Sequence, residues 1–463
     1  MTIRNKNIQV QVKIDSFTKE GRGFGSFIRH DEVSCPVEVP FAIPGDVAKV
    51  QLLPKRSGIY HSRLIEIVEG SLDRIPPRCI HFGICGGCRF QQITYENQRR
   101  LKEGLIQKCF PDISYTFHSA ESIWQHRNKM EFTFSSDSAK NHYLGLIMDG
   151  SRGKVFNLTE CHLTEPWFAE TVIAVRNWWK ETPLEAYHPS KNTGSLRTLT
   201  LREGKRTGDR MAFLTVSGNP AYAITKQQME QFAAVVRQVA GSSTSIFVRI
   251  HQSIKGKPTQ FFEMHLSGPD HIKEVLHIED HSLTFTISPS AFFQPNTAMA
   301  EKLYSKVVAL AGPLHDQVVY DLYCGTGTLG ICMAKKAKAV IGIELSADAA
   351  YDARNNAALN NLNNITIFTG AVEDKLKEIV EGKEHPLPDI VVLDPPRAGL
   401  DPRAIEQIKV LMPPKIIYVS CNPVSQAKNI TELLAFGYQI ISMDAVDQFP
   451  HTPHIENVVV LTL

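Results

Sequence analysis

The stretch VVYDLYCGTGTLG, residues 318–330, joins a short apolar segment to a glycine-rich turn. The apolar residues up to Leu322 predict a buried strand. The glycines then recur as G-x-G-x-x-G, and glycine lets the backbone approach a ligand beside the N-terminus of a following helix. The stretch therefore predicts a ligand-binding strand, turn and helix, although the pattern alone equally describes a nicotinamide dinucleotide site.

Strands and helices alternate from Ser288 onward, which is typical of a parallel, doubly wound sheet. The expected parallel strands are 318–323, 339–344, 365–368, 390–394 and 416–420. Two further strands, near 439–443 and 457–463, leave no room for a helix between them and predict an antiparallel edge. The fold class is α/β, with a Rossmann-like domain over residues 286–463.

Shorter elements precede this domain. Residues 7–67 alternate apolar and polar in runs broken by glycines, which predicts a small OB-like β-barrel over residues 1–70. A linker is expected around Pro76, because proline resists both helix and central strand. Residues 71–285 begin with a cysteine cluster and continue in short strands and helices, so they predict a central α+β domain.

Composition narrows the class of protein. The chain has 463 residues, too many for one ordinary core, and its 43% hydrophobic and 21% charged residues are typical of a folded protein. The net charge of +2 means that any affinity for nucleic acid must come from local basic patches. No segment resembles a signal peptide or approaches the ~18 apolar residues of a membrane span, so a cytoplasmic protein without membrane contact is expected.

The sequence LDPPR, residues 393–397, follows a later strand of the predicted sheet. Ligands gather at the carboxyl ends of such strands. A rigid Asp-Pro-Pro turn there presents the Asp394 carboxylate, which suits a hydrogen bond to the imide N–H of a base turned out of its helix. A dinucleotide dehydrogenase has no need of this turn, and arginine follows the prolines where amino methyltransferases usually have an aromatic residue.

The next strand delivers Cys421 to the same edge of the sheet, immediately before Asn422 and Pro423. Carbon C5 of uracil is a poor nucleophile, so a thiolate that adds to C6 would create an enolate able to attack a sulfonium methyl group. A lone cysteine is usually a small buried hydrophobe. Its position beside the Asp394 turn favours Cys421 as the nucleophile.

A base must remove the C5 proton after methyl transfer. Glu456 is the candidate, because it ends a polar loop that leads into the last strand. His451 and His454 in the same loop are alternatives. On the donor side, Glu344 at a strand end could hold a ribose hydroxyl, and Gln294 could bond polar groups of the donor.

Nine cysteines in a chain expected to be cytosolic argue against a disulfide framework. Cys79, Cys85 and Cys88 lie within ten residues, and Cys161 follows far downstream. Four thiolates can hold either zinc or an iron–sulfur cluster. One C-x-x-C pair instead of two favours a cluster. The neighbouring histidines, His81 and His162, could serve as ligands too.

Together these motifs resemble the bacterial 23S ribosomal RNA 5-methyluridine methyltransferases, the iron–sulfur branch of the uridine-C5 methyltransferase family. The resemblance covers nearly the whole chain, including HRNKMEF at 126–132, which is similar to the central-domain signature of the family. It implies S-adenosylmethionine as methyl donor and RNA as substrate. The N-terminal barrel is similar to a TRAM domain, which implies that it binds RNA.

The resemblance also implies roles for individual residues. A 4Fe-4S cluster and the donor would each have four protein contacts, Cys421 would be the nucleophile and Glu456 the proton acceptor. The implied cluster ligands are Cys79, Cys85, Cys88 and Cys161, and the implied donor contacts are Gln294, Tyr323, Glu344 and Asp394. The sequence departs from the family at Thr328, where some members have asparagine, and at Ala371, where a polar residue is common.

Alternative functions remain open at this point. The favoured RNA is 23S ribosomal RNA, but related enzymes with clusters act on transfer RNA. A nicotinamide-dependent oxidoreductase would use the same glycine turn, and a non-catalytic RNA-binding protein would use the barrel and the cysteines alone. No obligate protein partner is evident, and the sequence fixes neither the target uridine nor the oligomeric state.

Overall fold

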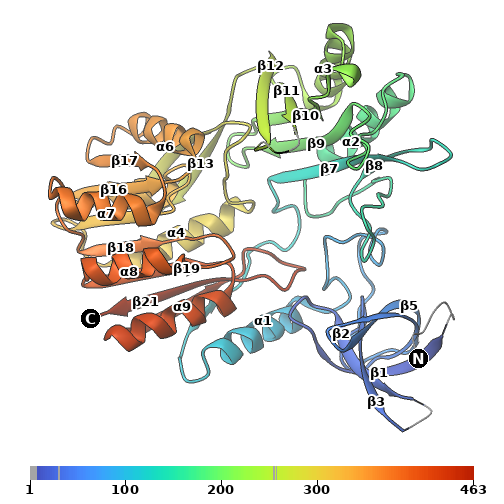
Figure 1. The fold of residues 1–463 in the computed structure, drawn as a ribbon, viewed down its shortest axis with the longest axis horizontal. Helices are drawn as coiled ribbons and strands as arrows, with labels where there is room; N and C mark the ends of the chain where they lie inside the picture. Colours follow the sequence, from blue (N-terminus) through green and yellow to red (C-terminus); the bar gives the residue numbers. More distant parts are fainter. Residues whose placement is uncertain (1–7, 30–31, 254–255, 257) are drawn as a thin grey trace. The chain divides into compact units, whose positions relative to one another are not determined.

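The computed structural model describes residues 8–29, 32–253, 256 and 258–463 (Figure 1). The chain forms two compact units. The first runs to Leu105 and includes Ile147–Gly153 and Phe449–Pro453, and the second comprises Ile106–Leu146, Lys154–Gln448 and His454–Leu463. No helix in the described ranges is long and apolar enough to cross a membrane.

The predicted N-terminal barrel is confirmed. Its five strands close in the order β1-β2-β3-β5-β4, with β1 antiparallel to β4. The strands are β1 (Gln9–Phe17), β2 (Gly23–Ile28), β3 (Ser34–Val39), β4 (Val47–Arg56) and β5 (Ile59–Glu69). Alternate residues such as Val12, Val37 and Ala48 point inward and are fully buried, which explains the period of two in the sequence.

The segment around Pro76 is more firmly attached than a free linker. Arg74 donates from Nε to Oδ1 of Asp46 over 3.1 Å and from Nη2 to the carbonyl of Phe41 over 3.0 Å. Asp46 is fully buried and also accepts from the backbone N–H groups of Ile43 and Ser71. These contacts fasten the start of the segment to the barrel, and α1 (Tyr95–Cys109) follows.

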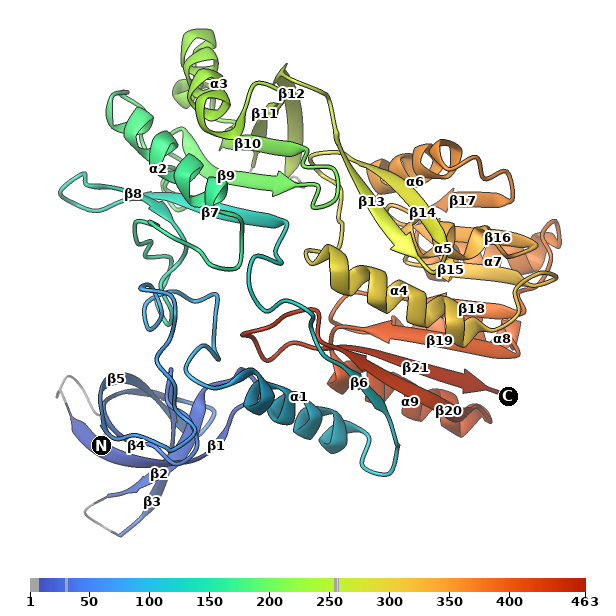
Figure 2. The same cartoon turned by 180° about the vertical axis from the view of Figure 1, so that it is seen from behind.

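A six-stranded sheet forms the middle of the second unit, in the order β12-β11-β10-β9-β7-β8. Its strands are β7 (Lys129–Ser136), β8 (His142–Gly145), β9 (Leu196–Glu203), β10 (Arg210–Ser217), β11 (Ser245–Gln252) and β12 (Gln260–Ser267). Two helices, α2 (Pro166–Lys180) and α3 (Lys226–Ala240), share a buried core with this sheet, including Phe132, Trp179 and Phe232 (Figure 2). Among the described strands of this sheet, only β10 and β11 are parallel neighbours, so the sequence shows no strict βα alternation here.

The C-terminal α/β sheet is confirmed, with eight strands in the order β17-β16-β15-β18-β19-β21-β20-β6. The strands are β15 (Val318–Leu322), β16 (Ala339–Glu344), β17 (Ile365–Thr369), β18 (Ile390–Leu393), β19 (Lys415–Ser420), β20 (Gln439–Val446), β21 (Glu456–Thr462) and β6 (Thr116–His118). Strands β15 to β19 are parallel, and β21 runs antiparallel to both β19 and β20, as predicted. The outermost strand β6 comes from before the six-stranded sheet and was not predicted.

Helices and one hairpin complete this part of the chain (Figures 1 and 2). The helices are α4 (Thr297–Ala311), α5 (Thr328–Ala334), α6 (Ala347–Leu359), α7 (Val372–Gly382), α8 (Pro402–Leu411) and α9 (Pro423–Phe436), and the hairpin is β13 (Ile272–Ile278) with β14 (His281–Ile287). Strand order reverses between β15 and β18. A doubly wound sheet opens its ligand crevice at such a point, beyond the carboxyl ends of the strands.

Candidate active site

The glycine-rich turn after β15 has the backbone geometry of a ligand cradle. Tyr323, Gly325 and Gly327 have φ angles of 66°, 56° and 76°. Glycine adopts positive φ without steric cost, whereas Tyr323 does so at a cost in strain that is common at functional sites. The Tyr323 hydroxyl is buried and has no hydrogen-bond partner among the described residues, which leaves it available to a ligand.

Two carboxylates hold this turn. Glu344, at the end of β16, accepts from the Gly325 N–H over 2.9 Å and from the Ser346 N–H over 2.7 Å. Asp321, buried within β15, accepts through Oδ2 from the Gly330 N–H over 2.7 Å, while its Oδ1 is buried without a partner in the described structure. Burial raises the pKa of Asp321 to about 7, and the charges of Asp394 and Glu344 add to this effect.

The strand ends bring Asp394 and Cys421 to neighbouring positions. Strands β18 and β19 pair in parallel with Leu393 opposite Tyr418, so the residues that follow each strand leave the sheet at the same edge. Asn422 donates from Nδ2 to the carbonyl of Arg397 over 2.9 Å and accepts from the Val424 N–H to cap α9. This bond ties the Asp-Pro-Pro-Arg turn to the cysteine loop.

The Cys421 thiol lies among three charged side chains. Burial is the main cause that raises its pKa, and the charges of Glu456 and Asp394 also raise it. Arg397 opposes them with its positive charge and with a hydrogen bond to the thiol. Arg397 stands out in the sequence as the residue after the two prolines. Its contact with the thiol was not predicted, because the two residues come from different loops.

Glu456 begins β21 and is buried, and β21 pairs with β19 so that Asn457 lies opposite Ser420. Burial raises its pKa well above the ordinary value, and the charge of Asp394 raises it further. Burial likewise raises the pKa of Asp394 to about 7. A carboxyl group with a raised pKa can exchange a proton near neutral pH, which is what a proton-transfer group needs.

Gln294, the fourth predicted donor contact, is held by residues from other segments. Its side chain is buried, its Oε1 accepts from Gln448 Nε2 over 3.2 Å, and its carbonyl accepts from Asn128 Nδ2 over 2.9 Å. No motif in the sequence pointed to Gln448. Its buried Oε1 has no partner among the described residues.

His451, one of the two alternative bases, lies in surroundings different from those of Glu456. His451 belongs to the first unit, where its N–H donates to Gln98 Oε1 over 2.8 Å and its Nδ1 lies 3.2 Å from Gln98 Nε2.

The sequence did not point to Tyr304, which is buried on α4. Burial raises its pKa well above 10, and the charges of Asp394 and Glu456 add to this effect.

Two positions where the sequence departs from the family lie at helix starts. Thr328 is buried at the beginning of α5, and its hydroxyl lies 3.1 Å from that of Thr326. Ala371 caps α7 without a side-chain hydrogen bond. Thr328 can still offer a hydroxyl to a ligand, whereas Ala371 can offer only its backbone.

The predicted cluster ligands fall in separate parts of the chain. Cys79, Cys85 and Cys88 lie in one loop of the first unit, where the Gly87 N–H donates to Cys85 Sγ over 3.3 Å. Cys161 belongs to the second unit. Within the described ranges, no three or more His, Cys, Asp or Glu side chains form a group that could hold a metal ion.

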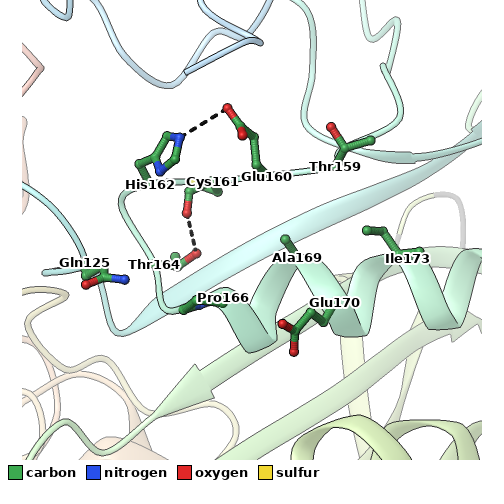
Figure 3. Close-up of a pocket in the computed structure, with 10 residues that line it drawn as sticks. All are labelled: Gln125, Thr159, Glu160, Cys161, His162, Thr164, Pro166, Ala169, Glu170 and Ile173. Atoms are coloured by element: carbon green, nitrogen blue, oxygen red, sulfur yellow. Dashed lines mark hydrogen bonds and ion pairs between the residues drawn. The ribbon is translucent and has the colours of Figure 1, made fainter. Parts of the chain in front are cut away.

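A pocket of about 220 Å³ lies beside Cys161 (Figure 3). His162 Nε2 lies 3.2 Å from Glu160 Oε1, and the Thr164 hydroxyl donates to the carbonyl of Cys161 over 3.4 Å. The start of α2, with Pro166, Ala169 and Glu170, forms the opposite side.

Known proteins with similar sequences or folds agree with this geometry. Residues 262–463 match the family model described as tRNA (uracil-5-)-methyltransferase. A protein of Protochlamydia amoebophila described as an uncharacterized RNA methyltransferase is 51% identical, over 92% of this chain and 100% of its own length. Another from Caldanaerobacter subterraneus is 34% identical, over 96% of this chain and 97% of its own.

Among solved structures, the Pyrococcus abyssi tRNA (uracil-54, C5)-methyltransferase in complex with S-adenosyl-L-homocysteine has the same fold. Its TM-score is 0.74 at 24% identity, and the match covers 98% of this chain and 100% of that one. The strand-end motifs, the glycine turn and the matched relatives agree, and the nicotinamide oxidoreductase and non-catalytic alternatives are wrong. The chain belongs to the family of S-adenosylmethionine-dependent RNA (uracil-5-)-methyltransferases.

Proposed function

We propose that this enzyme methylates C5 of a specific uridine in 23S ribosomal RNA, with Cys421 as the covalent nucleophile. The observation that carries the proposal is the grouping of Cys421, Arg397, Asp394 and Glu456, which lie beyond the carboxyl ends of β18 and β19 and at the amino end of the antiparallel β21. The choice of ribosomal RNA rests on the motifs shared with that branch of the family. Transfer RNA is the second candidate, because the matched family model is described by that substrate.

The residues around the glycine turn fit the methyl donor. The unpartnered Tyr323 hydroxyl and Asp321 Oδ1 can bind polar groups, and the positive-φ glycines leave space beside the backbone. We assign Gln294, Tyr323, Glu344 and Asp394 as donor contacts. S-adenosylmethionine supplies the electrophilic methyl group.

The reaction begins at the thiol. The Cys421 thiolate adds to C6 of the target uracil, which makes C5 nucleophilic. Arg397 lowers the pKa of the thiol and so favours the thiolate. Asp394 has two carboxylate oxygens, so it can contact the donor and accept a hydrogen bond from the imide N–H of the base at the same time.

The reaction ends with a proton transfer. Once C5 carries the methyl group, Glu456 removes the C5 proton, the C5–C6 double bond reforms and the C6–S bond breaks, so the thiolate returns to Cys421. Glu456 must be ionised to accept this proton, whereas burial and the charge of Asp394 raise its pKa well above the ordinary value.

We further propose that the barrel is a TRAM domain that binds RNA and that the enzyme works in the cytoplasm. Exposed cations on β4 and β5 support the first proposal, including Lys55, whose Nζ lies 4.4 Å from the centre of the Tyr60 ring. We also propose a 4Fe-4S cluster with Cys79, Cys85, Cys88 and Cys161 as ligands. The place of Cys161 in this set rests on the sequence alone.

The nucleophile is tested with RNA that contains 5-fluorouridine, which blocks removal of the C5 substituent and traps the adduct. We expect a covalent protein–RNA complex with the native chain and none with Cys421→Ala. Methylation without any adduct would overturn the assignment. Mapping of 5-methyluridine in 23S and transfer RNA of a deletion strain distinguishes the two substrates.

The cluster is tested by anaerobic purification. We expect iron and sulfide in the native chain and loss of both in Cys88→Ser. Bound zinc without iron, or iron that Cys88→Ser retains, would contradict the proposal.

A further inference from the structure

The side-chain amide of Gln294 is bonded on one side only. Its Oε1 accepts from Gln448 Nε2 over 3.2 Å, across 154 residues of sequence. Its Nε2 has no hydrogen-bond partner among the described residues, and it is not sealed from solvent as Gln448 Oε1 is. The atom that Gln294 can offer to a ligand is therefore Nε2, which is a hydrogen-bond donor.

The segment that carries Gln294 lies beside the glycine turn. The Thr326 hydroxyl donates to the carbonyl of Phe292 over 3.5 Å, two residues before Gln294. Asn128 donates from its side chain to the Gln294 carbonyl over 2.9 Å and from its backbone N–H to the Pro295 carbonyl over 2.8 Å. The backbone of Gln294 is thus fixed next to the cradle, and what remains to be set is the orientation of its side chain.

Gln448 can set that orientation because it is itself held in place. It is fully buried, its N–H donates to the carbonyl of Val446 over 2.9 Å, and its carbonyl accepts from Asn296 Nδ2 over 3.2 Å. Asn296 in turn caps α4 by accepting from the Met299 N–H. Gln448 is therefore a fixed partner for the amide of Gln294.

Stability alone does not favour glutamine at position 448. The Gln448 Oε1 atom is buried without a partner in the described part of the chain. A buried acceptor that makes no hydrogen bond destabilises a fold, and an apolar side chain of the same size would avoid that loss. The glutamine is better explained by what its Nε2 does to Gln294.

Two glutamine amides can pair in two ways, which differ by a half-turn of each amide group. In the observed pairing Gln294 presents Nε2 to a ligand, and in the reverse pairing it would present Oε1. The most strongly accepting group of S-adenosylmethionine is the carboxylate of its amino acid, which an N–H donor binds and a carbonyl oxygen repels. A ligand with that carboxylate therefore favours the observed pairing.

We propose that Gln448 is a positioning residue that turns Nε2 of Gln294 toward the amino-acid carboxylate of the methyl donor. This proposal rests on the proposed function, because it takes Gln294 as a donor contact. It predicts that a change at position 448 affects only ligands that carry the carboxylate.

The test is calorimetry of the full chain, without RNA, with two ligands. S-adenosylhomocysteine has the carboxylate, and 5′-methylthioadenosine lacks the whole amino acid. In Gln448→Glu the ionised side chain cannot donate, so Gln294 turns Nε2 toward it and presents Oε1 to the ligand. We expect S-adenosylhomocysteine to bind on the order of 30-fold more weakly at pH 8, and 5′-methylthioadenosine to bind as it does to the native chain.

Two further comparisons sharpen the test. Gln448→Met removes the pairing without reversing it, so the loss for S-adenosylhomocysteine should be only about threefold. When the pH is lowered, the carboxyl introduced in Gln448→Glu gains a proton and can donate again, so its affinity should recover relative to the native chain.

Gln92→Met is the matched control. Gln92 is also fully buried with unpartnered side-chain atoms among the described residues, but it belongs to the first unit. This variant should bind both ligands like the native chain. Thermal melts confirm that each variant is folded, and if Gln448→Glu does not fold, Gln448→Met decides by the same comparison of ligands.

The proposal is overturned if the variants at position 448 bind S-adenosylhomocysteine like the native chain. It is also overturned if they weaken both ligands equally, because the cradle as a whole would then be distorted. Failure of the donor assignment has a different signature: Gln294→Met then keeps the native affinity for S-adenosylhomocysteine. If Gln294→Met weakens binding and the changes at position 448 do not, only the role of Gln448 is wrong.

Discussion

The eight-stranded and six-stranded sheets of the second unit present their functional groups in different ways. In the eight-stranded sheet, chemistry lies beyond the carboxyl ends of the strands, where Asp394, Cys421 and the glycine turn leave a fully buried core. In the six-stranded sheet, Arg249 and Phe261 lie on the face itself. Strand ends fix a few groups in exact positions and suit bond making, whereas a sheet face offers area and suits binding.

Cys421→Ser tests this contrast with the largest expected effect. Methyl transfer should fall on the order of 10⁴-fold, as it does when a covalent nucleophile is removed, while RNA affinity and thermal stability change little. Single-turnover assays with labelled donor measure the loss. Cys332→Ser is the control, because Cys332 is buried in α5, and it should retain activity.

Glu456→Gln should have the second-largest effect on activity. It keeps the size of the side chain but cannot accept the C5 proton, so turnover should fall about 10² to 10⁴-fold. The covalent adduct with ordinary RNA should accumulate, because the methylated intermediate cannot collapse. Gel analysis of the protein–RNA complex checks this, and rapid turnover without adduct would show that another group is the base.

Asp321→Asn probes the stability of the same sheet edge. Burial raises the pKa of Asp321 from 3.8 in the unfolded chain to about 7, so its contribution is fully present below pH 4 and is lost as pH rises to 7. Asparagine still accepts from Gly330 and carries no charge. We expect the variant to exceed the native chain by about 4 kcal/mol in unfolding free energy at pH 8 and to match it at pH 4. Urea titrations at both pH values measure this, and an equal gain at both would contradict it.

Arg397→Met should have a smaller effect. Arg397 lowers the pKa of the Cys421 thiol, so its removal raises that pKa and reduces the thiolate fraction at neutral pH. Alkylation of Cys421 by iodoacetamide at pH 7 should slow about fivefold, with the rate profile displaced to higher pH. Arg397→Lys should lie between the two, and an unchanged profile would remove Arg397 from the mechanism.

The sequence predicted the position of a residue best where the order and direction of the strands determine that position. Asp394, Cys421 and Glu344 follow apolar strands, and parallel strands put their carboxyl ends at one edge, so their neighbourhood was predictable. The barrel was predictable from alternation alone. The six-stranded sheet was not, because its mixed strands and long connections give no regular period, and neither was β6, which has three residues.

The sequence by itself determined the α/β class and the glycine turn. It also predicted that Asp394 and Cys421 lie at one edge of the sheet and that Glu456 is the candidate base. Only the tertiary structure decided that Arg397 contacts the thiol, that Gln448 bonds to Gln294, and that Phe261 and Arg249 share a face. The physical reason is the separation along the sequence between the residues that interact. Strand periodicity and turn residues act between neighbours in sequence, whereas side-chain pairs across loops and strands exist only once the sheets have formed.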